Sequence, residues 1–316
     1  MDDADLQKLF MPLITDSVTA VRKGKKLVHY TTAESAYRII MGRQVWLRHV
    51  HLMNDYSEMR HGLTCLQRAW VSEAGGHLQQ WLDENWPGLR GEVESLFNSH
   101  ADGLTNQTYI TSLSEHDDNE DNYGRLSMWR AYGGRAGVAI VLNTDAFLSD
   151  TDELKVFSTP VVYIDVPEYE KWFSGWVKNL IAATGALKSL DRSIIHNILF
   201  YALRMTVLAT KHPGFREERE WRVFHSPIIE GKSEWISYEP EIIGGVPQPI
   251  VKLKLQDDEA AGVVGVDPAK LISRIIIGPC ESPLPIRNAM WGALESVGVA
   301  DPGERVWMSF IPLRHR

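Results

Sequence analysis

Cysteine is scarce in this chain of 316 residues, and a long apolar run is missing. The two cysteines, Cys65 and Cys280, lie far apart and lack the spacing of a metal ligand set, so neither a disulfide framework nor a zinc ribbon is indicated. No stretch approaches the roughly 18 apolar residues of a membrane span, and the acidic start has no apolar segment typical of a secretory leader. We therefore expect a reduced, cytoplasmic protein that does not enter a membrane.

An excess of basic residues is also missing. Lys and Arg number 33 against 41 Asp and Glu, which gives a formal net charge of -8. Proteins that wrap long duplex nucleic acid usually carry a basic excess, so this composition argues against that partner. The one dense basic cluster, at 21–26, is expected to be a solvated loop, with a contact to phosphate as the alternative.

Three familiar catalytic fingerprints do not occur in the sequence. It contains no Gly-x-Ser-x-Gly elbow, no Gly-x-x-x-x-Gly-Lys-Ser/Thr loop and no Gly-x-Gly-x-x-Gly turn. Serine hydrolases, phosphate-loop enzymes and proteins with a dinucleotide-binding sheet therefore lose support.

What is present is a succession of short apolar runs separated by segments with helical periodicity. This pattern predicts an α+β fold without internal repeats. Thr32 is expected to cap a helix that stops at Gly42. The acidic segment 115–121 is expected to be a mobile loop, and 226–249 to be irregular. The expected strands are 27–32, 44–51, 108–114, 137–142, 155–166, 251–255, 272–278 and 305–312, and the expected helical segments are 4–20, 33–41, 59–100, 127–134, 167–212 and 285–297.

The stretch 215–224 carries the densest set of chemically useful side chains. If it is a strand, Glu218, Glu220 and Arg222 share one face, and Trp221 and Val223 point to the other. Two carboxylates and a guanidinium would then project together. The alternative is a charged edge strand or helix end with a surface ion pair.

The histidines allow a metal site as a further hypothesis. His49 and His51 lie two apart on an expected strand, and His61 or Asp55 could complete a ligand set. The intervals match no established zinc signature, so we expect no metal. His29, in an early strand, is either structural or a ligand contact.

Several of these pieces occur in the same order in a family of uncharacterised bacterial proteins, which the chain resembles. The matching pieces are His29-Tyr30-Thr31, Trp46-Leu47, Asn54-Asp55-x-x-Glu58, Ser127-x-Trp129-x-x-Tyr132, Glu218-x-Glu220-Trp221-Arg222 and Ile275-Ile276-Ile277-Gly278. That family is similar to a distant branch of the ADP-ribosyltransferase fold of toxin enzymes. The resemblance implies a single domain over 1–316 with a split antiparallel sheet core and helical insertions at about 59–107 and 167–212.

The resemblance also implies that NAD is the substrate. Glu220 would stabilise the positive charge that develops on ribose as the nicotinamide bond breaks, and Glu218 would accept a proton from the nucleophile. His29 would bond the other ribose, and Arg48 or Arg222 would pair with the pyrophosphate. The residues expected to contact NAD are His29, Tyr30, Thr31, Arg48, Asn54, Trp129, Tyr132 and Arg222. Whether Trp129 or Tyr132 stacks on nicotinamide stays open.

The expected function is therefore NAD-dependent ADP-ribosyl transfer by a toxin or effector of phage defence or of a toxin–antitoxin system. The acceptor is RNA, DNA or protein, and a single-stranded nucleic acid is compatible with an acidic chain that has a local basic and aromatic groove. A cognate antitoxin or inhibitor protein is the expected partner. The rivals are a non-catalytic module that binds NAD or a nucleotide, and a metal-dependent hydrolase that uses His49, His51 and Asp55.

Overall fold

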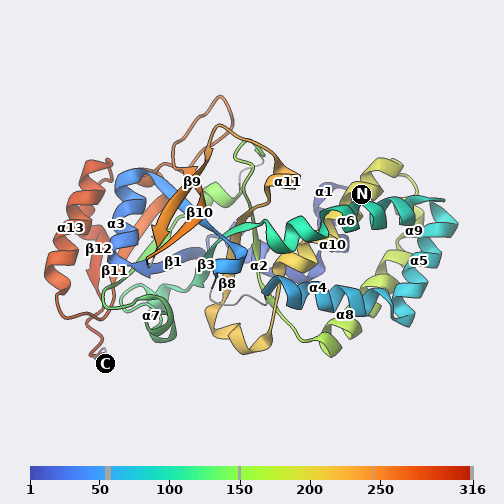
Figure 1. The fold of residues 1–316 in the computed structure, drawn as a ribbon, viewed down its shortest axis with the longest axis horizontal. Helices are drawn as coiled ribbons and strands as arrows, with labels where there is room; N and C mark the ends of the chain where they lie inside the picture. Colours follow the sequence, from blue (N-terminus) through green and yellow to red (C-terminus); the bar gives the residue numbers. More distant parts are fainter. Residues whose placement is uncertain (54–57, 149–150, 244, 314–316) are drawn as a thin grey trace.

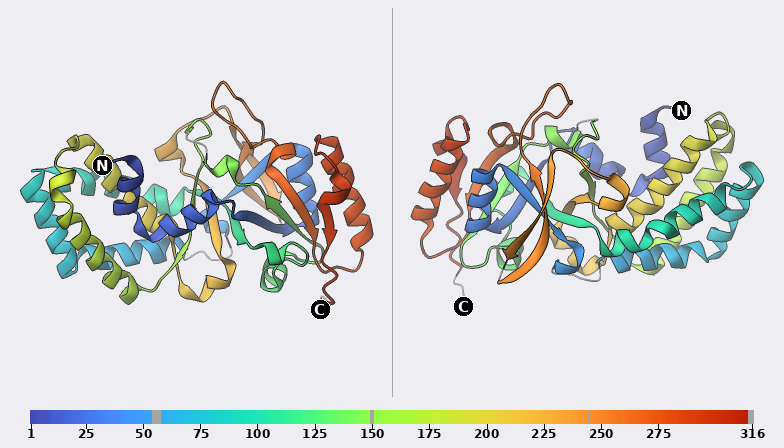
Figure 2. Two further views of the ribbon diagram at one scale, coloured as in Figure 1. Left: turned by 180° about the vertical axis from the view of Figure 1, so that it is seen from behind. Right: turned by 45° about the horizontal axis from the view of Figure 1, so that its top comes forward.

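The computed structural model describes residues 1–53, 58–148, 151–243 and 245–313. Figure 1 shows two regions along the long axis: a large sheet flanked by helices at one end, and a bundle of helices at the other. The N-terminus lies at the helical end and the C-terminus at the sheet end, as the views in Figure 2 also show. The mixed α+β class predicted from the sequence is confirmed.

The main sheet is mostly antiparallel. In the part of the chain that the structure describes, the strands follow in the order β12 (Val306–Met308), β11 (Ile272–Ile277), β4 (Gly137–Leu142), β1 (Lys26–Thr32), β3 (Tyr109–His116), β2 (Gln44–His49), β10 (Val246–Lys254) and β9 (Ile236–Ile243). Strand β8 (Glu220–His225) pairs with β3 and with β5 (Phe157–Pro160). Strands β6 (Val162–Tyr163) and β7 (Thr210–Lys211) form a separate parallel pair.

The sheet forks at β3. Strand β1 pairs with β3 in the register Val28↔Ser114, and β2 pairs with it in the register Arg48↔Ile110. Among the described residues, neither strand pairs with 111–113, where β1 and β2 diverge. On its other side β3 pairs with β8 along its whole middle, from Tyr109↔His225 to Ser114↔Glu220. The fork therefore leaves part of the β3 backbone facing a gap between two strands.

Helices cover both faces of the sheet. On one face lie α3 (Ala33–Gly42) and α13 (Pro283–Ser296), whose apolar residues share a core with the sheet. The short helices α12 (Pro268–Leu271) and α14 (Pro302–Arg305) adjoin β11. On the other face lies α7 (Leu126–Tyr132), whose Trp129 packs with Tyr30 and Ile276. Thr32 caps α3 as predicted, because its hydroxyl accepts from Ser35 N, and the helix ends at Gly42.

The two helical blocks predicted at 59–107 and 167–212 pack against each other. Their helices are α4 (Glu58–Trp70), α5 (Glu73–Asn85) and α6 (Leu89–Asn106), followed by α8 (Val166–Ala182), α9 (Thr184–Leu187) and α10 (Arg192–Ala209). One large apolar core joins them. Trp81 Nε1 donates to Thr184 Oγ across the two blocks at 2.8 Å, and Trp176 Nε1 donates to Leu9 O at 3.1 Å. The blocks thus form one helical lobe with the N-terminal helices α1 (Asp3–Phe10) and α2 (Pro12–Arg22).

Several local predictions were wrong. The helix expected over 4–20 breaks at Met11, where Pro12 begins α2. The segment expected to be irregular, 226–249, contains the short helix α11 (Pro227–Glu230) and most of the β9–β10 hairpin. The strand expected over 155–166 is divided into β5 and β6. The acidic segment 115–121, expected to be a mobile loop, instead includes the end of β3 and the 3-10 helix η2 (Asp118–Glu120).

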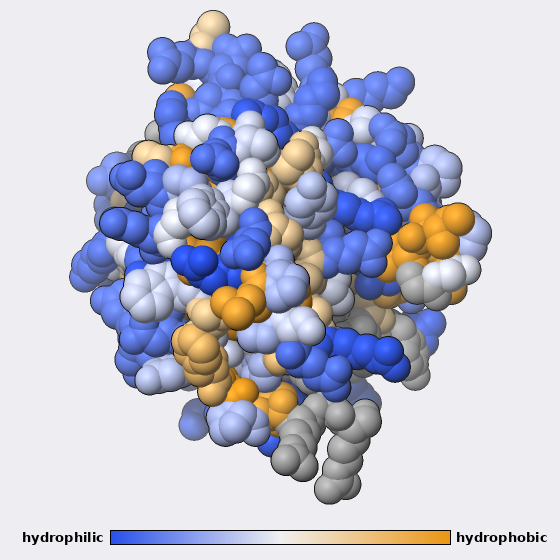
Figure 3. Space-filling view, turned by 90° about the vertical axis from the view of Figure 1, so that its left-hand side faces the viewer, coloured by the Kyte–Doolittle hydropathy of each residue, from blue (hydrophilic) through white to orange (hydrophobic). Residues whose placement is uncertain are grey.

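The surface at the sheet end is mixed in character. Figure 3 shows separate apolar patches among hydrophilic side chains on this face. Exposed large apolar residues of α13 and the segments after it are Leu284, Trp291, Trp307 and Phe310.

Among the residues that the structure describes, we find no helix whose length and apolar character would let it cross a membrane.

Candidate functional site

A cavity of about 500 Å³ lies at the fork of the sheet. Its wall includes Ile110, Thr111 and Ser112 of β3, at the place where β1 and β2 separate. Five residues predicted to contact NAD line it together: His29, Tyr30 and Thr31 of β1, Arg48 of β2 and Tyr132 of α7. The fork thus gathers into one cavity side chains that are about 100 positions apart in the sequence.

His29 is held by the exposed backbone of the fork. Its Nδ1 lies 3.0 Å from Ser112 O, and burial lowers the pKa of the imidazole, although the bond to Ser112 opposes this effect. The ring is therefore neutral at pH 7. A carbonyl oxygen only accepts, so Nδ1 carries the proton and Nε2 is left as a hydrogen-bond acceptor. This is the form needed to accept a bond from a ligand hydroxyl.

Tyr132 and Trp129, which the sequence could not separate, have different surroundings. Trp129 is 1% exposed, and its Nε1 donates to Tyr123 O at 2.8 Å. A Cβ added at Gly278 would meet the indole at 2.7 Å, so the ring is enclosed by backbone. The ring of Trp129 belongs to the core and does not line the cavity, so the structure gives no support to a contact between Trp129 and a ligand there. Tyr132 lines the cavity, and its hydroxyl donates to Glu218 Oε1 at 2.8 Å.

Tyr30 serves both the core and the cavity. Its ring packs edge-on against Trp129, with centroids 4.9 Å apart, and its hydroxyl accepts from Arg125 N at 2.8 Å. Burial raises the pKa of Tyr30 to about 12. The phenol is therefore neutral at physiological pH, and its ring is fixed between Trp129 and the backbone of Arg125 while the residue lines the cavity.

The two glutamates do not share a strand. Glu218 ends the 3-10 helix η4 (Pro213–Glu218), Arg219 has a positive φ of 46°, and Glu220 begins β8. The predicted common strand face for both residues is therefore wrong. Their carboxylates nevertheless meet at one ammonium group, since Lys211 Nζ donates to Glu218 Oε2 at 2.6 Å and to Glu220 Oε2 at 2.9 Å.

Glu220 lies behind the cavity wall. It is 4% exposed, and its Oε1 accepts from Ser112 Oγ at 2.7 Å and from Arg222 Nε at 2.9 Å. Burial alone would raise the pKa of its carboxyl, but the charges of Arg222 and Lys211 and these hydrogen bonds outweigh burial and lower the pKa to about 2. Glu220 is therefore ionised at neutral pH, and it reaches the cavity through Ser112 and Lys211, which line the wall.

The two arginines expected near pyrophosphate also differ. Arg222 is 0% exposed, and it donates to Glu220 and, through Nη1, to Leu208 O at 2.5 Å. Arg222 does not line the cavity and its guanidinium is buried, so the structure gives no support to a contact between Arg222 and pyrophosphate. Arg48 lines the cavity, and its Nε donates to Gln248 Oε1 at 3.1 Å.

The remaining predicted residues are less informative. Asn54 and Asp55 lie outside the described residues. The rings of His49 and His51 stack with centroids 5.4 Å apart, whereas His61 contacts Ile164 O at 2.9 Å. Within 1–53, 58–148, 151–243 and 245–313, no group of three or more His, Cys, Asp or Glu could hold a metal ion.

Sequence reasoning missed Lys211 and Ser112. Lys211 falls inside the segment 167–212 that we expected to be entirely helical, and it is instead part of the two-residue strand β7. Ser112 lies in a predicted strand without any flanking motif. No local signal marks either residue, because their importance comes from contact with Glu220, which follows them by 9 and 108 positions.

Comparison with known proteins identifies one region of the chain. Residues 128–223 match a family described as "Protein of unknown function (DUF2971)". The matched range runs from α7 to β8 and includes Tyr132, Lys211, Glu218 and Glu220. No curated protein and no solved structure matches the chain. A domain of the DUF2971 family is therefore found at residues 128–223.

Proposed function

We propose that this protein is an NAD-dependent ADP-ribosyltransferase and that the cavity at the fork binds the dinucleotide. The observation that carries the proposal is the convergence of His29, Tyr30 and Tyr132 on one cavity, with an ionised glutamate behind its wall. The cavity volume of about 500 Å³ lies within the usual range for small-molecule sites.

The charges in the wall suit a pyrophosphate. Three basic residues line the cavity: Arg38, Arg48 and Lys211. Among the described residues of the wall, Glu34 is the one acidic residue. Arg38 Nη2 lies 2.8 Å from Glu34 Oε1 in an exposed pair, which contributes little stability and can be exchanged for a ligand. In the proposal, Arg48 pairs with the pyrophosphate in a charge-assisted contact.

His29 and the tyrosines supply orientation. The acceptor Nε2 of neutral His29 takes a hydrogen bond from a ribose hydroxyl, and the ring of Tyr132 packs on nicotinamide. Thr31 adds a hydroxyl to the same wall. These contacts fix the dinucleotide so that its reacting ribose lies next to Ser112 and Lys211.

Glu220 then acts on the developing charge. Cleavage of the nicotinamide–ribose bond passes through an oxocarbenium-like state, which a nearby carboxylate stabilises. Lys211 holds a Glu220 oxygen at 2.9 Å without ligand. A bound pyrophosphate attracts the same ammonium, so binding of NAD draws Lys211 away and turns that oxygen toward the ribose. Glu218, which is bonded to Tyr132 and Lys211, accepts the proton of the attacking nucleophile.

The acceptor in this proposal is RNA, DNA or protein, and a nucleic-acid acceptor would be a single strand held in a local basic and aromatic groove rather than a long duplex, because the chain is acidic. The proposed setting is a cytoplasmic toxin or effector whose host carries an inhibitor protein.

The test is release of nicotinamide from NAD by the purified protein, alone and with RNA, DNA or cell extract. We expect Glu220→Gln to lower the rate by at least about 100-fold, because it removes the negative charge and keeps the shape. Glu92→Gln is the matched control, since Glu92 forms an exposed ion pair with Arg192 in the helical lobe. Full activity in a folded Glu220→Gln variant would refute the assignment.

One observation favours a second candidate, a module that binds NAD or a nucleotide without reaction. Both oxygens of Glu220 are already bonded, to Ser112, Arg222 and Lys211. Under this alternative Lys211 stays in place and the carboxylate only braces the wall. NAD would then raise the melting temperature without any release of nicotinamide.

A further inference from the structure

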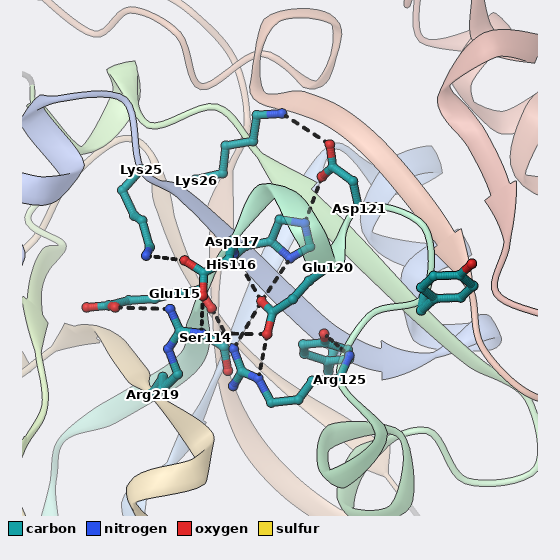
Figure 4. Close-up of polar contacts among 12 residues, drawn as sticks. Lys25, Lys26, Ser114, Glu115, His116, Asp117, Glu120, Asp121, Arg125 and Arg219 are labelled. Carbon is teal, nitrogen blue, oxygen red and sulfur yellow. Dashed lines mark hydrogen bonds and ion pairs between the residues drawn. The ribbon is translucent and has the colours of Figure 1, made fainter. Parts of the chain in front are cut away.

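Arg125, at the N-cap of α7, lies between the acidic segment after β3 and the turn that carries Glu218 and Glu220. Figure 4 shows its guanidinium directed into a group of carboxylates and backbone oxygens from these segments. Arg125 does not line the cavity at the fork. Its contacts join the acidic segment to the turn before Glu220.

Every N–H of the Arg125 guanidinium has an acceptor. Nε donates to Glu120 Oε1 at 3.0 Å. Nη1 donates to Glu217 O at 2.8 Å and to Glu218 O at 3.2 Å. Nη2 donates to Glu115 O at 2.8 Å and to Glu120 Oε2 at 3.3 Å. A lysine has three donors on one atom and cannot reproduce this planar arrangement.

The backbone of Arg125 makes a second connection. Its N–H donates to the hydroxyl of Tyr30, a residue that lines the cavity. One residue therefore fixes two parts of the site: its side chain holds the carbonyls before Glu220, and its main chain holds Tyr30. The helix that it caps also carries Tyr132.

The acidic partners of Arg125 are themselves fixed by ion pairs. Arg219 lies 2.6 Å from Asp117 and 3.6 Å from Glu120, and Lys25 also pairs with Asp117. The hydrogen bond from Arg219, followed by that from Lys25, holds the pKa of Asp117 well below its usual range. The basic cluster considered for phosphate contact is thus engaged here in part, and Figure 4 shows Lys26 directed at Asp121 as well.

The turn before Glu220 is held on its other side by β3. Ser114 Oγ donates to Glu218 O at 2.6 Å, and Glu115 N donates to Arg219 O at 2.8 Å. Arg219 has a positive φ of 46°, an unfavourable conformation for a residue with a side chain. The geometry of the turn therefore depends on the hydrogen bonds that hold its carbonyls. Arg125 supplies two of these bonds, to Glu217 O and Glu218 O.

We propose that Arg125 is a positioning residue for the glutamate pair. It keeps Glu218 and Glu220 at the distance from Tyr30 and Tyr132 that the reaction requires, without touching the ligand. This inference rests on the proposed function. Misplacement of a catalytic group by about 1 Å costs roughly 100-fold in rate, and a purely stabilising residue would not affect turnover in this way.

The test compares Arg125→Lys with wild type and with Arg130→Lys, an exposed position on the same helix. We expect Arg125→Lys to lower kcat for nicotinamide release about 10- to 100-fold and to leave KM for NAD within about 3-fold. Hydrogen exchange at the amides of Glu115, Arg219 and Glu220 should rise about 10-fold or more, while amides of the helical lobe keep their rates. Arg130→Lys should match wild type in both measurements.

Two outcomes separate this inference from the proposed function. If wild type releases no nicotinamide, the transferase proposal fails and the role of Arg125 in turnover fails with it; raised exchange at the turn in Arg125→Lys then shows only that Arg125 orders the turn that carries the glutamates. If wild type is active and Arg125→Lys keeps its full kcat, the positioning role is overturned and the transferase stands. Unchanged exchange at the turn overturns the positioning role in either case.

Discussion

Lys211 is the residue whose removal tests the site most directly, because its ammonium group joins the two glutamates. The side chain is 3% exposed, and Nζ contacts Glu218 and Glu220 at 2.6 and 2.9 Å. Replacement by Met keeps the length of the chain and removes the charge. The variant Lys211→Met therefore leaves two carboxylates with less positive charge around them in a poorly solvated place.

The expected cost follows from what remains. Loss of one partner from a buried ion pair typically destabilises a protein by 3–5 kcal/mol. Arg222 still bonds Glu220, and Tyr132 still donates to Glu218. We therefore expect a value at the lower end, about 3 kcal/mol in the free energy of unfolding at pH 7. Urea denaturation followed by far-UV circular dichroism measures it.

The pH dependence has a definite sign. The pKa of Glu220 is lowered from 4.5 to about 2 in the folded protein, so this carboxylate stabilises the fold above about pH 4.5 and loses its effect as the pH falls toward 2. Without Lys211 the pKa of Glu220 rises. The difference in stability between wild type and Lys211→Met should therefore be full at pH 7 and shrink below pH 4.5.

Two comparisons make the reasoning refutable. In the double variant Lys211→Met/Glu220→Gln, the second change removes the unbalanced charge, so its cost should be smaller than the sum of the two single costs. The variant Lys155→Met, in an exposed pair with Asp152, should leave the urea midpoint unchanged. A Lys211→Met protein with the wild-type midpoint, or additive costs in the double variant, would show that the buried pair is not coupled as described.

Two further predictions concern the core behind the cavity. Trp129→Ala should destabilise the protein by about 3–5 kcal/mol, because the indole is fully enclosed; Trp291→Ala, at an exposed position, should shift the urea midpoint far less, and equal shifts would contradict the placement of Trp129. Burial raises the pKa of Tyr30 to about 12, so its neutral form stabilises the fold fully below pH 10 and loses this effect as the pH rises through 12. Tyr30→Phe should lack that part of the alkaline loss in urea midpoints measured between pH 9 and 12, and a decline identical to wild type would refute the burial of this phenol.

The parts of the fold that were predictable are those set by local sequence. Six buried apolar residues make β4, between β1 and β11, and the run reads as a strand without knowledge of its neighbours. Thr32 caps α3 because its hydroxyl accepts a hydrogen bond from the amide of Ser35, three positions later. In both cases the deciding interactions lie within a few residues or depend only on apolar character.

The second half of β10 was predicted as the strand 251–255, but β9 and the first half of β10 were not, because no local pattern marks them. The strands of the β9–β10 hairpin contain Pro240, Pro247 and Pro249 and several charged residues, which are typical of loops. β9 lies at the end of the strand order, and an edge strand tolerates proline because one row of its backbone groups needs no partner. β10 pairs with β2, which lies over 190 positions earlier in the sequence, and β9 pairs with β10. These distant contacts decide the structure of the segment.

The role of Trp129 could not be assigned from the sequence, because one of the glycines that enclose its ring, Gly278, is distant in the chain. The sequence offered two aromatic residues for one stacking role, and side-chain type alone could not assign it. Three glycines decide the matter: a Cβ at Gly124, Gly137 or Gly278 would lie 2.7 to 3.0 Å from the indole. Gly278 is the last residue of the Ile275–Gly278 motif, and Trp129 belongs to the motif at 127–132. The two motifs are therefore in contact, because the Trp129 ring packs on the backbone of Gly278. These close approaches show that the Trp129 ring is packed in the core, whereas Tyr132 lines the cavity.

The site itself follows from the backbone of the forked sheet. Where β1 and β2 leave β3, the carbonyl of Ser112 loses a strand partner, and a buried carbonyl needs a donor. His29 supplies it from β1, which fixes the tautomer and leaves Nε2 as an acceptor. The hydroxyl of the same Ser112 donates to Glu220 on the strand that pairs with the other side of β3. Ser112 thus orients His29 through its carbonyl and Glu220 through its hydroxyl. One residue of β3 therefore sets the relative positions of two side chains that lie 191 positions apart in the sequence. The cavity and the oriented imidazole arise where the sheet divides, and a continuous sheet at this place would have neither.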